Sequence, residues 1–524
     1  MKVALICPPY PLEEYPSPPL GISYVAATLE EIGVDVEIWD FIVQKYTHEK
    51  IERFVKRFNP DVVGATSVTM NFLFAQKILK EVKKLAPDVI TMMGGPHVSF
   101  DIKDTLNLYP HIDLIVVGEG ELTLKELIPD IKNKKNWKNI KGIAFRNEDG
   151  SINITPKREL IPDLSKLPLP ARHLLPLSKY LALGFPVSIT TSRGCPNKCI
   201  FCQGRRLLGL KPRYRPIGSV VSEIEYLLSL GFSRINFADD FFTSNKPRVK
   251  DLCGEIKKRG LEFSWSAFVR VDSVDRELLL AMKDAGCDTV SFGVESGNEE
   301  MLKRIRKRIK ISQVKEAARI CKDVGMRCLA SFIVGLPGES YETLRDTEKL
   351  AKELEELGIE YGYHMLAPFP GTTIREDIDK YDLKILSNNW DDYDANRPIV
   401  ATSSLGPQDI ENFVKKYEND LKIVQEQTKE KYKQGKLSEL EKFHFEGMMR
   451  TEVIFELLKN DIIEEFPLIS EDRDPVYELS QKISKITGKD VSFVEYVIKD
   501  ITQKGYLRCI KDTNGYKWLW KENE

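Results

Sequence analysis

The stretch TTSRGCPNKCIFCQ, residues 190–203, places Cys195, Cys199 and Cys202 at a Cys-x3-Cys-x2-Cys spacing. It continues from a short apolar segment that reads as a strand, so the thiols are expected in a loop after that strand. Three thiolates can bind zinc or an iron–sulfur cluster, but a structural zinc site takes four ligands, commonly from two paired knuckles. The sequence contains no second knuckle. Three cysteines on a four-iron cluster leave one iron open to a substrate or cosubstrate.

With Phe201 before its last cysteine, this motif resembles that of the radical SAM superfamily. In that superfamily the three cysteines hold a [4Fe-4S] cluster, which binds S-adenosylmethionine through its amino and carboxylate groups. The resemblance implies that the reduced cluster cleaves S-adenosylmethionine to a 5′-deoxyadenosyl radical, which abstracts hydrogen from an unactivated carbon. It also implies an electron donor such as a ferredoxin or flavodoxin.

The sequence after the motif alternates strand-like and helix-like segments, as a partial (β/α)6 barrel requires. This alternation predicts a barrel domain over residues 186–385. The six strands are predicted within PVSITTSR (186–193), RINFADD (234–240), EFSWSAFVRVD (262–272), TVSFGVESG (289–297), MRCLASFIVGLPGES (326–340) and IEYGYHMLAPFPGT (359–372).

Chemistry in such a barrel is expected where strands end in loops. The resemblance assigns residues at these ends to S-adenosylmethionine: Phe201, Asp239, Asp240, Arg270, Glu295 and Gly335. Glu295 and Arg270 would hydrogen-bond the ribose or the methionine part, and the glycine turn at Gly335 would let the backbone approach the adenine. Two other interpretations stay open: Arg270 could form a surface ion pair with Asp272, and Asp240 could cap the segment that follows it.

Residues 1–125 show a second, separate alternation. KVALICPPY and DVEIWDF read as strands around the helix LGISYVAATLEEIG, which ends at Gly33, and the pattern repeats through residue 121. This predicts a doubly wound, Rossmann-like parallel sheet whose ligand sits outside the carboxyl ends of the strands. Because no Gly-x-Gly-x-x-Gly follows the first strand, a dinucleotide is disfavoured.

The turns PPLGISYVAATL, GATSVT, GGPHVS and GEGE resemble those of the cobalamin-binding domain that some radical SAM proteins carry. The resemblance assigns these residues to the corrin and its nucleotide tail: Pro19, Gly21, Ser67, Thr69, Gly94, Gly95, Pro96, His97, Gly118, Glu119 and Gly120. The chain lacks the Asp-x-His-x-x-Gly motif whose histidine ligates cobalt elsewhere, so the loop SVTMNF, residues 67–72, would face the lower side of cobalt. We do not expect His97 to ligate cobalt. The alternative is a degenerate flavodoxin-like domain without cobalamin.

Residues 126–185 read as a bridge with a hairpin around residues 148–150. The prolines of LPLPARHLLPLSKY, residues 167–180, predict an extended, semi-rigid connection. Residues 386–524 are strongly charged and mainly helical, and we expect the helical segment at residues 408–463 to cap the barrel mouth. The last segment predicts a helix and a hairpin around residues 513–515, similar to a winged helix, which would serve substrate docking or folding.

Composition narrows the classes of function. A chain of 524 residues is long enough for several domains, and no apolar run of membrane-spanning length occurs. Its 77 basic and 79 acidic residues give a net charge of −2, which disfavours a nucleic-acid partner. The six cysteines outside the motif lie singly, which indicates neither a disulfide framework nor an auxiliary cluster. The first residues do not read as a secretion signal, so a cytoplasmic protein is expected.

Together these patterns predict a cobalamin-dependent radical SAM enzyme, similar to the class B methyltransferases, that methylates an unactivated carbon through methylcobalamin. The alternative is a cyclase, a ring-rearranging enzyme or a lipid- or tetrapyrrole-tailoring enzyme without methyl transfer. A methylthiotransferase would need three more cysteines in the N-terminal domain, which has only Cys7. A cobalamin sensor would leave the cysteine motif without a purpose. The substrate is open among a protein side chain, a lipid, a tetrapyrrole and a small molecule, and no residue is assigned a catalytic role. Aromatic residues near the sixth strand could face it: Tyr361, Tyr363, His364 and Phe369.

Overall fold

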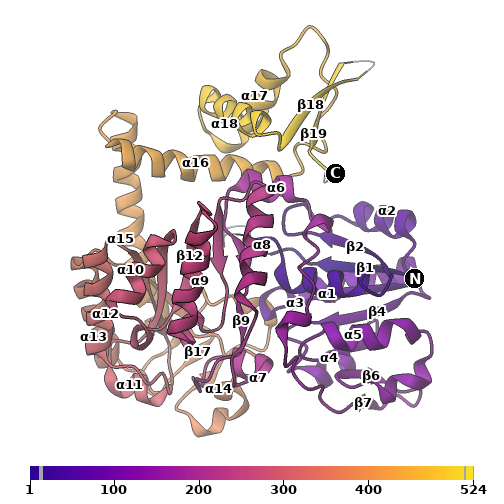
Figure 1. Ribbon diagram of the computed structural model, residues 1–524, viewed down its shortest axis with the longest axis horizontal. Helices are drawn as coiled ribbons and strands as arrows, with labels where there is room; N and C mark the ends of the chain where they lie inside the picture. The colour runs from indigo at the N-terminus through magenta and orange to yellow at the C-terminus, as the bar shows by residue number, and fades with distance from the viewer. Residues whose placement is uncertain (11–15, 513–514, 523–524) are drawn as a thin grey trace.

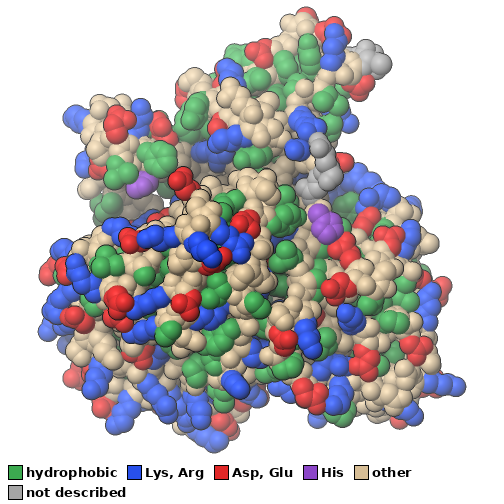
Figure 2. All heavy atoms as spheres, viewed as in Figure 1, with side chains coloured by type: hydrophobic (Ala, Val, Ile, Leu, Met, Phe, Trp, Pro, Cys, Tyr) green, Lys and Arg blue, Asp and Glu red, His purple; other side chains and the backbone are tan. Residues whose placement is uncertain are grey.

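The computed structural model describes residues 1–10, 16–512 and 515–522. Two α/β bodies lie side by side, and a C-terminal unit of helices and one hairpin lies above them in Figure 1. Basic and acidic side chains are interspersed over most of the face drawn in Figure 2. Within the described residues, no helix is both long enough and apolar enough to cross a membrane.

The N-terminal body is built on a seven-stranded sheet in the order β2-β1-β3-β4-β5-β6-β7. The first five strands are parallel to one another. Their bounds are β1 Lys2–Cys7, β2 Asp35–Asp40, β3 Val62–Thr66, β4 Ile90–Gly94 and β5 Leu114–Val116. The central strands are apolar on both faces, as the sequence KVALIC of β1 illustrates, because helices cover both sides of the sheet.

Alternate residues of β1 enter two separate hydrophobic clusters. Val3 and Leu5 pack with residues of helices α1 and α5, while Ala4 and Ile6 pack with residues of α2 and α3 on the other face. The helices of this body are α1 Leu20–Glu30, α2 His48–Phe58, α3 Phe72–Leu85, α4 Ile102–Leu108 and α5 Glu121–Leu127. This arrangement confirms the predicted doubly wound sheet.

The predicted hairpin within residues 126–185 is present, but it belongs to the N-terminal sheet. Strands β6 Ile143–Arg146 and β7 Ile152–Ile154 pair antiparallel with each other, and β6 pairs antiparallel with β5. Residue 125, the expected end of the first domain, lies inside α5. The hydrogen-bonded sheet therefore continues past that boundary to Ile154.

The central body contains the six predicted parallel strands in the order β15-β14-β13-β12-β11-β8. Their bounds are β8 Val187–Ile189, β11 Arg234–Phe237, β12 Ser264–Val269, β13 Cys287–Glu295, β14 Arg327–Val334 and β15 Glu360–Met365. The helices between them are α8 Ile217–Ser229, α9 Lys246–Lys258, α10 Arg276–Asp284, α11 Glu299–Arg304, α12 Ile311–Val324 and α13 Tyr341–Glu356. Since β8 and β15 are the two ends of this sheet, the barrel is open, as predicted.

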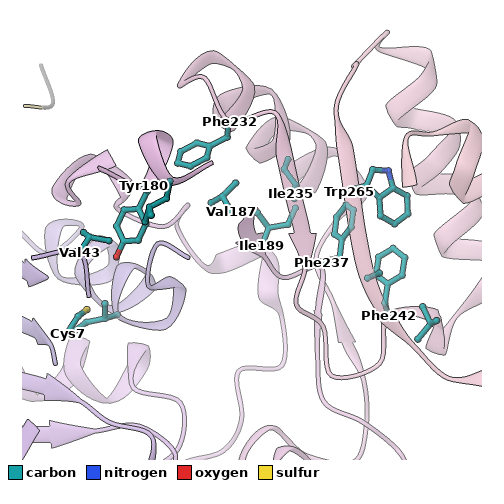
Figure 3. Packing of buried hydrophobic residues seen from close by; sticks show 14 of the residues in the cluster. Cys7, Val43, Tyr180, Val187, Ile189, Phe232, Ile235, Phe237, Phe242 and Trp265 are labelled. Carbon is teal, nitrogen blue, oxygen red and sulfur yellow. The ribbon is translucent and has the colours of Figure 1, made fainter. Parts of the chain in front are cut away.

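Short elements complete the two bodies. They are α6 Leu177–Leu183, β9 Ser192–Arg193, α7 Gly204–Leu208, β10 Arg213–Tyr214, α14 Thr373–Glu376, β16 Lys384–Ile385 and β17 Val400–Ala401. Tyr180 of α6 lies between the two bodies, with Cys7 and Val43 on one side and Val187 and Phe232 on the other (Figure 3). One buried cluster thus runs through the connecting segment from the first sheet into the barrel.

The C-terminal unit corrects one expectation. Its elements are α15 Pro407–Lys433, α16 Glu439–Lys459, α17 Pro475–Thr487, α18 Val491–Gln503, β18 Leu507–Asp512 and β19 Gly515–Trp520. The predicted cap over the barrel mouth is wrong, because α15 leans on the edge strand β15 and α16 packs on α6, at the end where β8 begins (Figure 1). The predicted helix and hairpin are present as α18, β18 and β19, and residues 513–514 of the hairpin tip lie outside the described residues.

Candidate active site

The cysteine loop follows β8 and is held at its base by backbone contacts. Strand β9 pairs antiparallel with β10, and the Cys195 N–H donates to the Gly209 carbonyl oxygen at 3.1 Å. Gly194 has a φ of 100°, and a Cβ there would lie 2.9 Å from the Lys211 carbonyl oxygen. Only glycine fits this position without displacing the backbone of the return segment. The loop bearing the three cysteines is thus tied at both ends.

The three thiols are close enough to influence one another's pKa values. Burial raises the pKa of Cys199, while the nearby cations of Lys307 and Arg270 lower it. Burial also raises the pKa of Cys202. Among the described residues, no three His, Cys, Asp or Glu side chains are grouped so that they could hold one metal ion. A four-iron cluster instead binds each thiolate at a separate iron, and a loop of three thiols with cations beside it fits that chemistry.

Asp239 and Asp240 follow strand β11 and contact the segment that leads into the cysteine loop. Asp239 is buried and accepts hydrogen bonds at 2.6 Å from the Thr191 N–H, the Thr191 hydroxyl and the Ser192 hydroxyl. Burial raises its pKa against these hydrogen bonds. Asp240 accepts from the Gly194 N–H at 2.8 Å. Both carboxylates therefore organise the segment that leads into the cysteines, and their contact with S-adenosylmethionine stays a prediction.

Glu295 and Arg270 come together beside the cysteine loop through Lys307, which the sequence analysis missed. The Lys307 ammonium donates to Glu295 Oε1 at 2.6 Å, and both side chains are buried. Arg270 forms a two-pronged ion pair with Asp272 and also donates to the Lys307 carbonyl oxygen at 2.9 Å. The ion pair that the sequence suggested for Arg270 is therefore present, but the Arg270 side chain is only 11% exposed. Phe201 lies beneath this group, with the Lys307 ammonium 6.0 Å from its ring centroid.

Three residues of this region other than glycine have left-handed backbones. Glu295, Arg306 and Arg308 have φ values of 71°, 58° and 57°. Such conformations cost free energy, and they cluster where surrounding structure forces them, often at functional sites. Within RIRKRIK, residues 304–310, Lys307 reads as one of several solvated cations, so no sequence signal separates it from its neighbours. In the structure Lys307 lies between two left-handed residues, Arg306 and Arg308, and its side chain is buried.

The turn at Gly335 depends on a second residue that the sequence analysis missed. Gly335 has a φ of 89°, and its N–H donates at 2.6 Å to the carboxyl group of Glu339, which also accepts from the Leu336 N–H. Glu339 is fully buried, and burial raises its pKa to about 8. A carboxyl group that stays protonated at neutral pH therefore fixes the turn at the end of β14.

A cavity of about 310 Å³ lies between the carboxyl ends of the N-terminal strands and the start of the cysteine loop. Seven of the residues predicted to contact cobalamin line it: Gly21, Gly94, Gly95, Pro96, Gly118, Glu119 and Gly120. The barrel contributes Thr190, Ser192, Arg193 and Asp240. Apolar side chains of Leu5, Val25, Met92, Val116 and Leu124 form much of the remaining wall.

Glycine is required at one of these positions on steric grounds. Gly95 has a φ of 108°, and a Cβ there would lie 2.4 Å from the Ser67 carbonyl oxygen. A Cβ on Gly21 would meet no atom within 4 Å, because this residue faces open space. The cavity therefore has one turn that only glycine can form and open space at Gly21, and it fits a ligand that needs close backbone approach.

The other residues predicted to contact cobalamin lie outside the cavity lining. Pro19 precedes α1, and Ser67 and Thr69 are buried in the loop after β3. His97 is fully buried: its ring stacks on Phe72 at 4.0 Å between centroids, and its Nδ1 lies 3.2 Å from the Thr69 hydroxyl. Burial lowers its pKa. One face and Nδ1 of the imidazole are therefore engaged by protein groups, while Nε2 lies 3.6 Å from Asp101 and has no hydrogen-bond partner among the described residues.

The aromatic residues near the sixth strand take part in packing. Tyr361 and Tyr363 contact Tyr417 of α15 at ring-centroid distances of 5.0 and 5.2 Å. His364 is exposed. The first two residues thus hold α15 against the barrel edge.

Glu119 is the point where the cavity meets the cysteine loop. Its carboxylate accepts at 3.0 Å from Arg193 and Arg213 and at 2.8 Å from the Ile161 N–H. Burial raises the pKa of Glu119, but the hydrogen bonds from Arg213 and the charge of Arg193 outweigh this and lower it overall. Both carboxylate oxygens of Glu119 therefore accept hydrogen bonds from the barrel or from the segment that connects the two bodies.

Comparisons with known proteins agree with this geometry. The family model of the radical SAM superfamily matches residues 189–351, and that of the B12 binding domain matches residues 14–128. An uncharacterized methyltransferase of Pyrococcus horikoshii is 36% identical over 424 residues, which are 79% of this chain and 91% of that protein. An anaerobic magnesium-protoporphyrin IX monomethyl ester cyclase of Rubrivivax gelatinosus is 31% identical over 64% of this chain, which spans 62% of its length.

The fold is also shared with a solved structure. The cobalamin-dependent S-adenosylmethionine radical enzyme OxsB, with aqua-cobalamin and S-adenosylmethionine bound, superposes with a TM-score of 0.68. The match covers 96% of this chain and 80% of that one at 18% identity. The arrangement of a doubly wound domain, an open barrel and a C-terminal unit is thus the same in both.

Proposed function

Because this chain belongs to the family of radical SAM enzymes that carry a B12 binding domain, we propose that it methylates an unactivated carbon of its substrate with S-adenosylmethionine and cobalamin. One observation carries this proposal. The glycine-lined cavity of the first domain is bounded on its other side by Arg193, two residues before Cys195, and by Asp240, which accepts from the Gly194 N–H. Cobalamin held by the first domain and S-adenosylmethionine held beside the cysteine loop would therefore be close enough to act on one substrate.

When bound, the [4Fe-4S] cluster with S-adenosylmethionine supplies hydrogen abstraction from carbon, and cobalamin supplies the methyl group. The chain would hold the cluster through Cys195, Cys199 and Cys202. Burial raises the pKa of Cys199, and the cations of Lys307 and Arg270 partly offset that rise, in the direction of the thiolate that iron requires.

We assign Glu295, Arg270 and the Gly335 turn to S-adenosylmethionine, with Lys307 added to the set. Lys307 offers the only ammonium that pairs with Glu295 in the described residues. A buried ion pair that already contains both signs can bind the amino and carboxylate groups of a methionine moiety without leaving a charge unpaired. Asp239 and Asp240 act by positioning the loop, and Phe201 packs below the pair.

We assign the cavity of about 310 Å³ to the nucleotide tail of cobalamin. Its volume suits an aromatic base with part of its linker, and the corrin would lie across the glycine turns at its mouth. Leu5, Met92 and Val116 exclude water from the base. Because the His97 ring is held by Phe72 and Thr69, we propose that it supports the loop at residues 67–72 and does not ligate cobalt.

Domain limits and partners follow from the same proposal. We place the cobalamin domain at residues 1–154, which extends the expected limit of 125 to include the β6–β7 hairpin. An external one-electron donor such as a ferredoxin or flavodoxin would reduce the cluster. The substrate class remains open among a protein side chain, a lipid, a tetrapyrrole and a small molecule.

A second candidate function is cyclisation without methyl transfer, which the 31% identity to a magnesium-protoporphyrin cyclase favours. The two functions differ in what they make from S-adenosylmethionine. Methyl transfer releases S-adenosylhomocysteine, whereas radical chemistry alone releases 5′-deoxyadenosine.

The test is anaerobic incubation of the cobalamin-loaded holoenzyme with S-adenosylmethionine and a strong reductant, followed by chromatography. We expect both products, with S-adenosylhomocysteine stoichiometric with bound cobalamin. Cys195→Ala should abolish 5′-deoxyadenosine. If the holoenzyme forms 5′-deoxyadenosine without S-adenosylhomocysteine, the methyltransferase proposal is wrong and the second candidate is favoured.

A further inference from the structure

Four buried charged residues join the two α/β bodies next to both candidate cofactor sites. We call Glu119, Glu121, Arg193 and Arg213 the interdomain clamp. Arg193 donates to Glu119 at 3.0 Å and to Glu121 at 2.6 Å, and Arg213 donates to Glu119 through both terminal nitrogens at 3.0 Å. No side chain of the four is more than 11% exposed.

The acidic half of the clamp belongs to the glycine turn of the first domain. Glu119 lies between Gly118 and Gly120, and all three line the cavity assigned to cobalamin. Its carboxylate also accepts from the Ile161 N–H at 2.8 Å, in the segment that connects the two bodies. A movement of this turn would therefore strain the hydrogen bonds of Glu119 to the connecting segment and to the barrel.

The two arginines of the clamp lie at the two ends of the cysteine loop. Arg193 is separated from Cys195 only by Gly194, and Arg213 lies opposite it, since the two residues pair in strands β9 and β10. Arg213 also donates to the Leu208 carbonyl oxygen at 2.9 Å and to that of Ile161 at 2.6 Å. Both ends of the loop at residues 194–212 are thus fixed to the same carboxylate.

The strength of the clamp comes from burial. Removing one member of a buried ion network leaves the others charged and unpaired, which is far more costly than losing an exposed ion pair. Methyl transfer between two separately held cofactors needs a fixed separation, because a misplacement of about 1 Å can cost about a hundredfold in rate. Within the described residues the two main sheets share no strand, so side-chain contacts such as the clamp contribute to that separation.

We propose that Glu119 is a positioning residue that fixes the cobalamin turn relative to the cysteine loop through Arg193 and Arg213. The role in methyl transfer rests on the proposed function, whereas the mechanical link between the two segments does not. Glu119 is not a cofactor ligand in this proposal, because its oxygens are taken by the two arginines.

The link is tested by hydrogen exchange on the cofactor-free full-length chain. In Glu119→Gln, amides of residues 194–209 should exchange at least about tenfold faster than in the wild type, although residue 119 belongs to the other domain. The matched control is Glu464→Gln. It breaks the ion pair with the buried Lys179, 2.6 Å away, at an interface that touches neither cofactor site. Unchanged exchange of the loop in Glu119→Gln, or an equal increase in the control, would overturn the link. If Glu119→Gln does not fold, Arg213→Lys is measured in its place, because it keeps the charge and loses the two-pronged contact.

The positioning role is tested on protein loaded with both cofactors. Electron paramagnetic resonance of cob(II)alamin reports its magnetic coupling to the reduced cluster and hence their separation. Glu119→Gln should keep the wild-type cobalt and iron contents but show a weaker, more widely distributed coupling. A variant that loses cobalamin outright would mean that Glu119 binds the cofactor and would refute the positioning role. If the wild type itself retains no cobalamin, the proposed function fails, while the exchange experiment still decides the link.

Discussion

The ammonium of Lys307 lies 2.6 Å from the carboxylate of Glu295, and both side chains are less than a tenth exposed. The pair rests on Gly293. A Cβ at that position would lie 2.4 Å from Glu295 Oε1 and 2.9 Å from the Lys307 nitrogen. The backbone of Glu295 is left-handed, with a φ of 71°. A glycine, a strained backbone and a buried ion pair therefore meet beside Cys199.

Glu295→Gln should lower the free energy of unfolding by about 3–5 kcal/mol, because it leaves the Lys307 ammonium buried without a counter-charge. The double variant Glu295→Gln/Lys307→Met should recover most of that loss, since both charges are then gone. Urea unfolding of the cofactor-free chain measures both changes. Equal stability of the single variant and the wild type would show that the pair contributes no buried charge interaction.

Gly21 lines the proposed cobalamin cavity and faces open space, so a larger side chain there should block the ligand without disturbing the fold. Gly21 is the second residue of α1, and a Cβ there meets no atom within 4 Å. Gly21→Leu should therefore fold at least as stably as the wild type, because glycine costs about 1 kcal/mol in a helix. It should bind cobalamin at least about tenfold more weakly, which corresponds to about 1.4 kcal/mol.

Gly218→Leu is the control for this substitution. Gly218 is also the second residue of a helix, α8, and a Cβ there also meets open space. Equilibrium dialysis with hydroxocobalamin should show unchanged binding for this variant. If Gly21→Leu binds cobalamin as the wild type does, the cavity is not the cobalamin site.

Glu339 predicts a pH dependence of stability. Its pKa is about 8 in the folded chain, and its ordinary value is 4.5. Between these values the folded state keeps a proton that the unfolded state releases, so this residue makes stability fall as pH rises. The slope is at most about 1.4 kcal/mol per pH unit for one proton. Glu339→Gln keeps an oxygen for the Gly335 N–H and removes the titration.

Urea unfolding of the wild type and of Glu339→Gln at several pH values from 5 to 8 checks this prediction. The stability of the variant relative to the wild type should increase steadily across that range. Parallel pH profiles would mean that Glu339 is ionised in the folded chain and that burial does not control its pKa.

The sequence predicts the two sheets well because their signal is local. Apolar strands and amphipathic helices alternate with a regular period, and the cysteines and glycine turns fall at strand ends, where ligands of α/β folds collect. The roles of Lys307 and Glu339 at the site could not be predicted from the sequence, for a physical reason. Their burial depends on left-handed turns and tertiary contacts. In the sequence, Lys307 lies among charged residues typical of a surface, and Glu339 lies in a glycine- and proline-containing turn that is equally typical of one.

The position of a segment in space is equally hard to predict from its own residues. The β6–β7 hairpin has a recognisable turn, but its pairing with β5 is a long-range contact. Helix α16 carries the charges expected of an exposed helix, yet Phe455 on it contacts Phe185 next to α6. That contact places it at the far end of the barrel from the cysteine loop.

Metal content per chain tests the central claim most directly. After anaerobic reconstitution with iron, sulfide and hydroxocobalamin and removal of unbound cofactors, we expect about four irons and one cobalt per chain. Cys195→Ala, Cys199→Ala and Cys202→Ala should each lose the iron and keep the cobalt, whereas Cys509→Ala, outside the motif, should keep both. Four irons without retained cobalt would contradict the claim that this chain joins a radical cluster to cobalamin.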